Sequence, residues 1–419
     1  EQGIIQAAAA GGGPHGFDCD APTTVVVRAE IAPLYDVMLD GEGKLSIESA
    51  GWERLFFVRA GVTLELARLE LSKGSADDGG ALYNEGRAKL IDVRIANNQA
   101  SERGGGVYSA PGSELILEGV TVADNVASGT GEAAGGGLYL VDATTFIRNS
   151  VVETNVARGR SARSGRRARG GGLFVSGGAL YVEDSRIASN SAIGGDGSGD
   201  VETAGYARGG GLHLIDATAL ITRSAVSGNQ SLGGYAYRGG GFASGGGIHL
   251  DGGALSIDST TISGNVADGV SGPWEAGTAG GLMMYPDSSV VALNTTISGN
   301  RADFSEGIHV GGQASAAFYS CTIAFNSTDE SRSSLRFDSD SDATFSHTII
   351  ANAGRCSGSL RSLGHNLFAP NFACSIGGDA AGDLLDVDPR LQPLADNGGP
   401  TQTHAPLEAS PALEAGDPA

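Results

Sequence analysis

The sequence is poor in methionine, tryptophan and cysteine, and it lacks long apolar runs. Its 419 residues include only 3 methionines, 2 tryptophans and 4 cysteines. No uninterrupted apolar run reaches about 18 residues, which excludes an ordinary transmembrane helix. No segment sustains the apolar period of roughly 3.6 residues that marks an amphipathic helix, so we expect few helices.

Positive charge is scarce as well. The chain has 27 basic and 48 acidic residues, and its formal net charge is −21. Such a balance argues against a general affinity for nucleic acid or for anionic membranes, and we expect neither as a partner. The arginine run in residues 158–169 is a local exception, either a solvated loop or an anion-binding patch.

Glycine, in contrast, is abundant, with 68 residues spread along the chain as part of a repeat. Each repeat ends in an asparagine that follows a short apolar segment. These asparagines are Asn98, Asn125, Asn155, Asn190, Asn229, Asn265, Asn300, Asn326 and Asn352. They are separated by 27, 30, 35, 39, 36, 35, 26 and 26 residues, which indicates a fixed coil with insertions of different length.

Each repeat predicts three short strands. The first follows a glycine cluster, as in Leu212-His213-Leu214, the second is of the type Leu255-Ser-Ile257, and the third precedes the asparagine. We therefore predict an all-β, single-domain, right-handed parallel β-helix, a solenoid of about nine recognisable coils plus caps. We expect each asparagine to adopt a left-handed backbone at its corner and to bond the next asparagine along the axis.

The ends of the chain lack the repeat. We assign residues 1–60 to an N-terminal cap and first coils, 61–353 to the repeats and 354–419 to a C-terminal cap. Cys356 and Cys374 lie in an irregular stretch that a disulfide would staple. Cys321 occupies a position that is Ser or Thr in most coils, so we expect a buried thiol. Cys19 would lie about 40 Å from it at ~4.8 Å per coil, too far to pair.

Two motifs resemble a known group of proteins. The alternation of Gly-Gly-Gly-Leu/Ile with Ile-Ser-Gly-Asn is similar to that of bacterial secreted β-helix repeat proteins of the polymorphic outer-membrane-protein type. The ending from Asp396-Asn-Gly-Gly-Pro-Thr-Gln-Thr-His404-Ala to Ser410-Pro-Ala resembles the segment that closes the helix in large surface proteins of that kind. The resemblance covers about residues 15–416. It implies a secreted or cell-surface protein whose export signal has been removed before Glu1, and it supplies no catalytic residue.

Long insertions mark one corner of the solenoid. Four successive coils carry them between the asparagine and the next glycine cluster, in residues 156–169, 191–208, 230–244 and 266–279. Because they leave the coils at the same corner, they should form a wall beside the strand that follows. Insertions gathered on one face commonly mark the binding face of a solenoid.

The wall and the adjoining strand are rich in rings and guanidinium groups. The strand residues expected to point outward are Tyr83, Tyr108, Tyr139, Phe174, His213, His249, Met283 and His309. Sugar faces stack on rings and arginine binds carboxylates, which favours an anionic polysaccharide or cell-surface glycan as partner. The expected binding residues are Tyr139, Phe174, Arg166, Arg167, Arg169, Tyr235, Trp274 and Glu275. Outward rings also stack on one another simply to cover a sheet, and that interpretation stays open.

A polysaccharide lyase is the favoured reaction if the protein is an enzyme, which the sequence leaves open. β-Elimination of a uronic acid needs a cation for the carboxylate, a base for the C5 proton and an acid for the leaving oxygen. Those roles fall to Arg208 or Arg238, to His213 or His249, and to Tyr206 or Tyr237, respectively. The same residues also suit a non-enzymatic cell-surface adhesin or matrix protein, which is the alternative.

Evidence for other chemistry is weaker. Asp216 and Asp251 end successive strands, but similar aspartates recur in other coils, so turns are favoured over a hydrolase pair. The acidic runs 196–202 and 338–342 offer oxygens that suit calcium without the spacing of a recognised loop. We expect no required cofactor, with calcium left open, and a monomer that does not insert into membranes.

Overall fold

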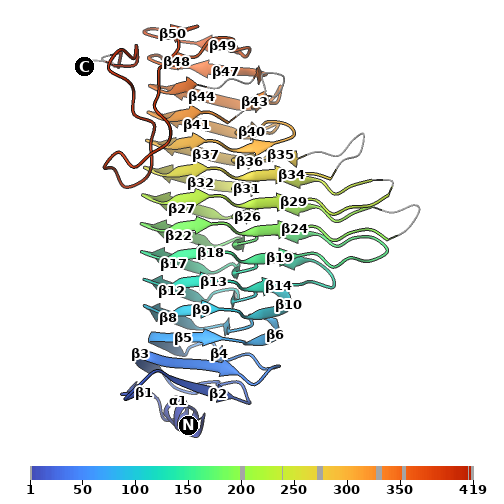
Figure 1. Ribbon diagram of the computed structural model, residues 1–419, viewed down its shortest axis with the longest axis vertical. Coiled ribbons are helices and arrows are strands. Elements are labelled where there is room, and N and C mark those ends of the chain that lie inside the picture. Colours follow the sequence, from blue (N-terminus) through green and yellow to red (C-terminus); the bar gives the residue numbers. More distant parts are fainter. Residues whose placement is uncertain are drawn as a thin grey trace.

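The structure is a computed structural model that describes residues 2–198, 203–237, 239–270, 277–326, 333–351, 355–413 and 415–416. Nearly all regular elements are short strands that stack in parallel on the equivalent strands of neighbouring coils (Figure 1). They form a 26-stranded, an 11-stranded and a 13-stranded sheet, which we name sheets A, B and C. The predicted all-β parallel β-helix is confirmed.

One coil illustrates the three predicted strands. After the glycine cluster, β26 (Leu212–Ile215) belongs to sheet B, and β27 (Thr218–Thr222) and β28 (Ala225–Ser227) both belong to sheet A. Alternate residues such as Leu212, Leu214 and Ile221 are fully buried in a core that runs through the solenoid. The period of two therefore places every second residue of sheet B on the outer face.

The asparagine ladder holds the coils together at the corner after sheet A. The eight ladder asparagines in the described part of the chain, from Asn98 to Asn326, have no exposed surface. In the seven from Asn98 to Asn300, the Nδ2 group donates to the Oδ1 atom of the next asparagine, as from Asn190 to Asn229 at 3.0 Å. Asn190 also donates to the carbonyl of Val152 at 2.9 Å. The predicted axial bonding is confirmed, and Asn352 lies outside the described residues.

The backbone assignment at this corner was wrong by one residue. The left-handed conformation belongs to the residue before the ladder asparagine, for example Asn97 with φ 57°, Thr154 with φ 55° and Ser189 with φ 55°. In three coils this residue is a glycine, which carries no penalty there. The asparagine itself is kept for its buried amide, which bonds along the axis.

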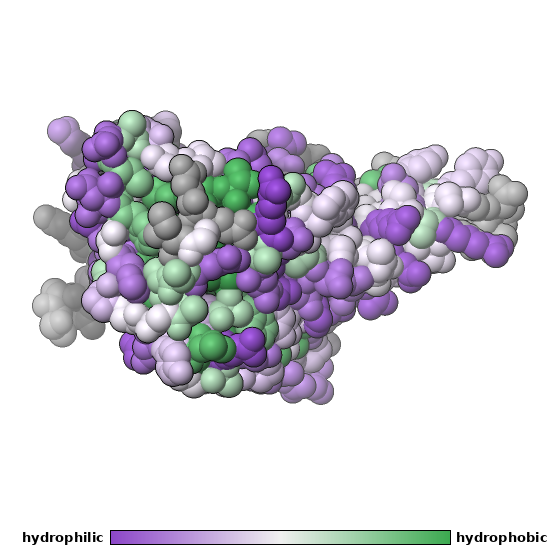
Figure 2. Space-filling model, turned by 90° about the horizontal axis from the view of Figure 1, so that it is seen from below, coloured by the Kyte–Doolittle hydropathy of each residue, from purple (hydrophilic) through white to green (hydrophobic). Residues whose placement is uncertain are grey.

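The long insertions contain regular strands that form sheet C. Each insertion leaves the coil on a short strand, such as β24 (Ser191–Ile193) or β29 (Gln230–Leu232), and returns on another, such as β25 (Ala207–Arg208) or β30 (Ala243–Ser244). Outgoing strands pair with outgoing strands of the next coil, and returning strands with returning strands. The result is a thin two-layered projection, named the fin, that stands out from the solenoid (Figures 1 and 2).

Small residues make the fin thin. Its two layers meet at fully buried alanines, which are Ala133, Ala157, Ala168, Ala192 and Ala207. Nearer the tip, a Cβ atom built on Gly205 would lie 1.9 Å from the carbonyl oxygen of Arg166, and one on Gly241 would lie 2.0 Å from that of Gly205. Only glycine permits such an approach of backbone to backbone. Viewed along the solenoid axis, the visible surface of the fin is largely hydrophilic (Figure 2).

The ends differ from the repeats. Helix α1 (Gln2–Gly11) lies at the N-terminal end and buries Ile5, Ala8 and Ala9 in the core. No helix in the described part of the chain has the length and apolarity of a membrane span. Near the other end Cys356 and Cys374 form the predicted disulfide, whereas Cys19 and Cys321 are free thiols. Burial raises the pKa of Cys321 to about 12, consistent with the expected inert thiol.

The C-terminal closing segment runs back along the side of the solenoid (Figure 1). Thr261 donates its hydroxyl proton to the carbonyl of Gln402 at 2.6 Å, and Ser298 lies 2.8 Å from Nε2 of His404. A cavity of about 580 Å³ between this segment and sheet A is lined mainly by Phe325, Leu391, Pro393, Leu394 and His404. This cavity lies on a different side of the solenoid from the predicted site.

Candidate functional site

The predicted site lies in the corner between the outer face of sheet B and the returning layer of the fin. The predicted ladder of outward residues is in register: Tyr108 pairs with Tyr139, Phe174 with His213, and His213 with His249. Phe57 extends the ladder at the N-terminal end. From Phe57 to Phe174 consecutive rings stack with centroids 4.6–5.4 Å apart. We name this row of side chains the ring ladder.

The expectation that the ring ladder faces open solvent was wrong for most of its members. His213 and His249 have no exposed surface, and Phe174 and Tyr108 are only 5% and 7% exposed. Tyr83 and Tyr139 keep part of their surface accessible. The rings point away from the core as predicted, but stacking on one another and the adjacent fin remove them from water.

Arginines of the fin and of neighbouring segments form the other side of the corner. The Arg103 guanidinium lies 5.3 Å from the ring centroids of both Tyr108 and Tyr139, and it forms two hydrogen bonds with Asp78. Along the returning layer, Arg103 is in register with Ala134, Ala134 with Arg169, and Arg169 with Arg208. Arg169 pairs with Glu132 at 2.5 Å. All three arginines are paired with acids, Arg103 with Asp78, Arg169 with Glu132 and Arg208 with Asp251.

Arg208 lies beside a cavity in the corner. Its Nη1 atom is 3.5 Å from Oδ2 of Asp251, and its guanidinium carbon is 5.1 Å from the ring centroid of Tyr285. A cavity of about 170 Å³ is lined by Tyr206, Ala207, Arg208, Phe242, Ser244 and Tyr285. Tyr206 is 38% exposed, and the guanidinium of Arg167 lies 5.6 Å from its ring centroid. A ligand in the corner would therefore reach rings and guanidinium groups together.

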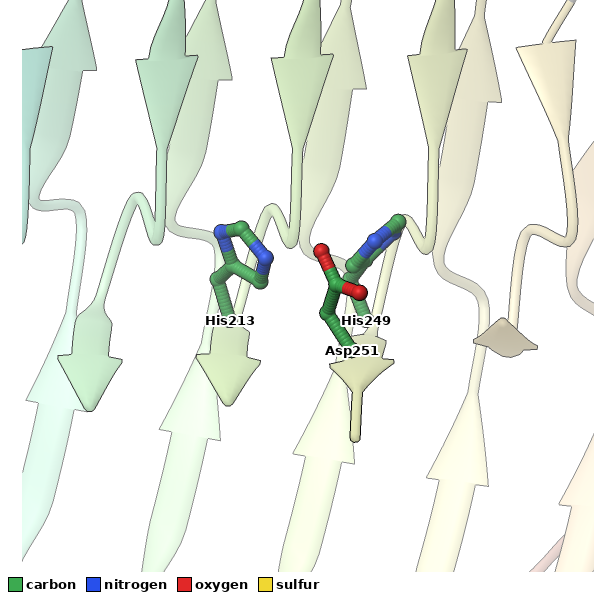
Figure 3. Close-up of side chains that lie close together, drawn as sticks. All are labelled: His213, His249 and Asp251. Carbon is green, nitrogen blue, oxygen red and sulfur yellow. The ribbon is translucent and has the colours of Figure 1, made fainter. Parts of the chain in front are cut away.

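The two buried histidines and Asp251 form a compact cluster (Figure 3). The imidazole ring centroids are 4.7 Å apart, and the planes meet at 86°. One nitrogen or oxygen atom from each of the three side chains lies within 4.8 Å of the others. His249 shares a hydrogen bond of 3.0 Å between Nδ1 and the Ser244 hydroxyl. Among the described residues, both ring nitrogens of His213 and Nε2 of His249 have no hydrogen-bond partner.

Burial keeps both imidazoles neutral. It is the largest cause that lowers the pKa of His213 well below the ordinary value of 6.5, followed by the nearby His249. Burial likewise lowers the pKa of His249, and the Arg208 and Arg169 guanidiniums lower it further, against a hydrogen bond from Ser244 that raises it. A neutral imidazole has one nitrogen lone pair available to accept a proton or to bind a metal ion.

The other predicted site residues are distributed along the fin. Arg166 and Arg167 are exposed in the segment between β19 (Val156–Arg158) and β20 (Ala168–Arg169). Tyr235 and Tyr237 lie in the segment between β29 and β30, where they are 57% and 77% exposed, and they do not belong to the histidine cluster. Arg238, Trp274 and Glu275 lie outside the described residues. Of the predicted catalytic set, His213, His249, Arg208 and Tyr206 are thus brought together around one part of the corner.

Three residues of this part were not predicted as site members: Asp251, Ser244 and Tyr285. The sequence pattern equates Asp251 with Asp216, but in the structure Asp251 is in register with Ile215. Asp216 is the residue after Ile215 and lies in a turn with φ 49°. Counting two residues from His249 would have placed Asp251 on the same face as the imidazole. Ser244 could have been found from its position directly before a glycine cluster, because Arg208 occupies the same position in the preceding coil.

The acidic runs show no calcium site among their described residues. Asp338 lies 3.2 Å from Nε2 of His309 and 3.2 Å from Nε of Arg336. Asp196 accepts a hydrogen bond from the backbone N–H of Tyr235 at 2.8 Å. Asp200 and Glu202 lie outside the described residues. Asp196 and Asp338 therefore have partners within the protein.

Comparisons with known proteins extend only to the fold. No protein-family model matches the chain, and no curated protein matches it either. Among solved structures it is similar to the A-module of the mannuronan C-5 epimerase AlgE6 from Azotobacter vinelandii. The TM-score is 0.44 with 14% identity, over 92% of this chain and 93% of that one. A likeness this distant carries no argument about the site or its ligand.

Proposed function

We propose that the protein binds an acidic, uronate-containing polysaccharide along the corner between sheet B and the fin. The observation that carries this proposal is the group formed by Arg167, Tyr206 and Arg208 on the returning layer. Their side chains are at least partly exposed, one guanidinium lies against the Tyr206 ring, and the cavity beside them ends at Tyr285. Rings suit the apolar faces of sugars, and guanidinium groups suit their carboxylates.

Charge supports an anionic ligand at this place. The protein as a whole has a net charge of −21, yet the fin segment of one coil carries Arg158, Arg160, Arg166 and Arg167 as exposed residues. A local positive surface on an acidic protein gives orientation, because an anionic chain is repelled elsewhere and attracted to the fin. The parallel stacking of coils extends the corner along the solenoid, as a polymer requires.

Binding is better supported than cleavage. A lyase base must approach the C5 proton to hydrogen-bond distance, and neither His213 nor His249 has any exposed surface. Tyr206, the acid of the lyase hypothesis, and Arg208, its cation, both line the cavity and are accessible. The two histidines that could act as its base are not accessible. The disulfide suits an extracellular or cell-surface location, where such polymers occur.

The proposal is tested by affinity measurements with a panel of polysaccharides. Polygalacturonate or hyaluronan is expected to bind, and neutral dextran is expected not to bind. Arg167→Ala and Arg208→Ala should each weaken binding about tenfold, consistent with loss of a charge-assisted hydrogen bond. The matched control is Arg223→Ala, because Arg223 is also partly exposed but pairs with Asp184 beside sheet A. Equal losses in all three variants, or binding of dextran, would contradict the proposal.

The same incubations decide the question of lyase activity. β-Elimination creates an unsaturated uronate that absorbs in the ultraviolet. A steady increase with any acidic polymer, abolished in His213→Phe or His249→Phe, would establish cleavage and require that the buried imidazoles become accessible. A constant signal together with measurable affinity is the result that we expect.

The fin tip favours a second function, adhesion to another macromolecule. Tyr235 and Tyr237 are exposed aromatic residues on a projecting segment, and such residues are enriched in protein interfaces. Tyr237→Ala would then reduce attachment to cells or matrix while leaving the affinity for polygalacturonate unchanged. Unchanged attachment in a Tyr235→Ala/Tyr237→Ala double variant would exclude the tip as an adhesive surface.

A further inference from the structure

We propose that His213, His249 and Asp251 bind a divalent transition-metal cation of the zinc class. The three side chains come from two adjacent strands, β26 and β31 (Ile248–Asp251), and all project from the outer face of sheet B (Figure 3). The proposal is independent of polysaccharide binding, because it concerns the buried floor of the corner and its test uses no polymer.

The first support is the lack of hydrogen-bond partners at fully buried atoms. His213 has no exposed surface, and neither of its ring nitrogens has a partner within the described residues. Buried polar atoms in folded proteins nearly always have a partner, so each exception calls for one. The remaining rings of the ladder, from Phe57 to Phe174, avoid this cost because they are phenyl or phenol rings that stack in nearly parallel planes.

The second support is the geometry of the cluster. The regular stacking ends at His213, whose ring is turned 87° from the plane of Phe174 and 86° from that of His249. The candidate ligand atoms lie within 4.8 Å of one another. Tetrahedral zinc with bonds of about 2.0–2.2 Å has ligand atoms roughly 3.4 Å apart, so rotations of the side chains would close the site by about an ångström.

The chemistry of the donor set points to zinc rather than to calcium or magnesium. Two imidazoles and one carboxylate are intermediate ligands that suit zinc, cobalt, nickel or ferrous iron, whereas calcium prefers oxygen ligands alone. The Ser244 hydroxyl contacts Nδ1 of His249, so this ring can donate its Nδ1 proton to Ser244 and present Nε2 to the metal. Such an outer hydrogen bond typically fixes the orientation of a metal-ligating histidine.

Positive charges near the cluster lower its expected affinity for a metal cation, but acidic residues balance them. Arg208 and Arg169 both lie near the two imidazoles, and their positive charges would repel a cation. Asp251 and Glu132 pair with these two arginines and compensate their charge. Since a carboxylate has two oxygens, Asp251 can bind the metal through one and keep Arg208 at the other.

A fourth coordination position would face the cavity of about 170 Å³. Three residues of its lining touch the cluster: Ser244 bonds His249, Arg208 faces Asp251, and the Tyr285 ring centroid is 5.0 Å from that of His249. Three protein ligands with one open position are the arrangement that exchanges a water or a substrate group.

The test uses the full chain after treatment with a chelator and gel filtration. One equivalent of zinc or cobalt per chain is expected to bind, and cobalt should give the visible absorption bands of a four- or five-coordinate site. His213→Phe, His249→Phe and Asp251→Asn should each lower the zinc affinity at least tenfold. The phenylalanines continue the ring ladder, so thermal unfolding should show that these variants stay folded.

The matched control disrupts a second close pair of imidazoles among the described residues. His347 and His365 stack with centroids 5.1 Å apart near the C-terminal end of the solenoid. His347→Ala should bind zinc as the wild type does. The proposal is overturned if no stoichiometric metal binds, or if zinc is retained in His213→Phe and His249→Phe and lost in His347→Ala.

Discussion

The substitution His213→Phe should make the metal-free protein more stable. A buried donor or acceptor without a partner costs about 1–3 kcal/mol, and His213 has two such nitrogens. A phenyl ring removes both and can pack on Phe174, although its larger volume costs roughly 1–3 kcal/mol if the site does not adjust. At neutral pH we therefore expect a gain of about 1 kcal/mol in the free energy of unfolding.

The gain should increase as the pH falls. Because the folded-state pKa of His213 lies well below its ordinary value of 6.5, the unfolded chain binds a proton near that pH while the folded chain does not. The wild type thus loses ~1.4 kcal/mol per pH unit per imidazole below that value, and nothing above it. Between about pH 6.5 and pH 5 the variant should gain a further ~2 kcal/mol over the wild type.

Urea unfolding at several pH values with a chelator present measures this difference. His309→Phe is the control, since burial lowers the pKa of His309 as well but Asp338 opposes that effect. Its gain at low pH should therefore be smaller. An identical pH dependence in wild type and His213→Phe would refute the reasoning, because it would mean that the folded protein protonates this imidazole freely.

Other substitutions test the ladder and the fin. Asn190→Ala removes the axial bonds to Asn229 and leaves the backbone N–H of Asn155 without its acceptor. Chemical unfolding should therefore show that the free energy of unfolding falls by about 3 kcal/mol. A fall of less than about 1 kcal/mol would contradict the role of the ladder. Gly205→Ala places a Cβ atom 1.9 Å from a carbonyl oxygen and should open the fin to limited proteolysis, with the solenoid still folded. Its control, Gly131→Ala, meets nothing nearer than 3.7 Å and should be cleaved no faster than the wild type, and equal protection of both variants would argue against the tight fin.

The coil and the register were predictable because each depends on a local pattern that repeats. A period of two residues fixes which side chains face the core, and the buried asparagines mark the same corner in each coil. The same pattern aligned Tyr139, Phe174, His213 and His249 correctly. The one-residue error at the asparagine corner arose because Asn97, Thr154 and Gly228 share no residue type that would signal a common left-handed backbone.

The burial of the histidines could not be predicted in the same way. It depends on the fin, whose strands β20, β25 and β30 contain two residues each and show no detectable alternation. Their pairing depends on glycines and alanines that meet between two layers, and this is visible only when the insertions of four coils are placed together. The sequence therefore predicted which side chains share the outer face of sheet B but did not reveal that His213 and His249 are shielded from water.

Hydrogen exchange with and without polygalacturonate tests the central claim most directly. If an acidic polysaccharide lies in the corner, amides of the returning fin strands β20 and β25 and of the strand before Tyr285 should exchange more slowly with the polymer present. Amides of sheet A around Arg223 should be unchanged. Protection confined to sheet A or to the C-terminal closing segment, or no protection at saturating polymer, would contradict the assignment of the corner as the binding site.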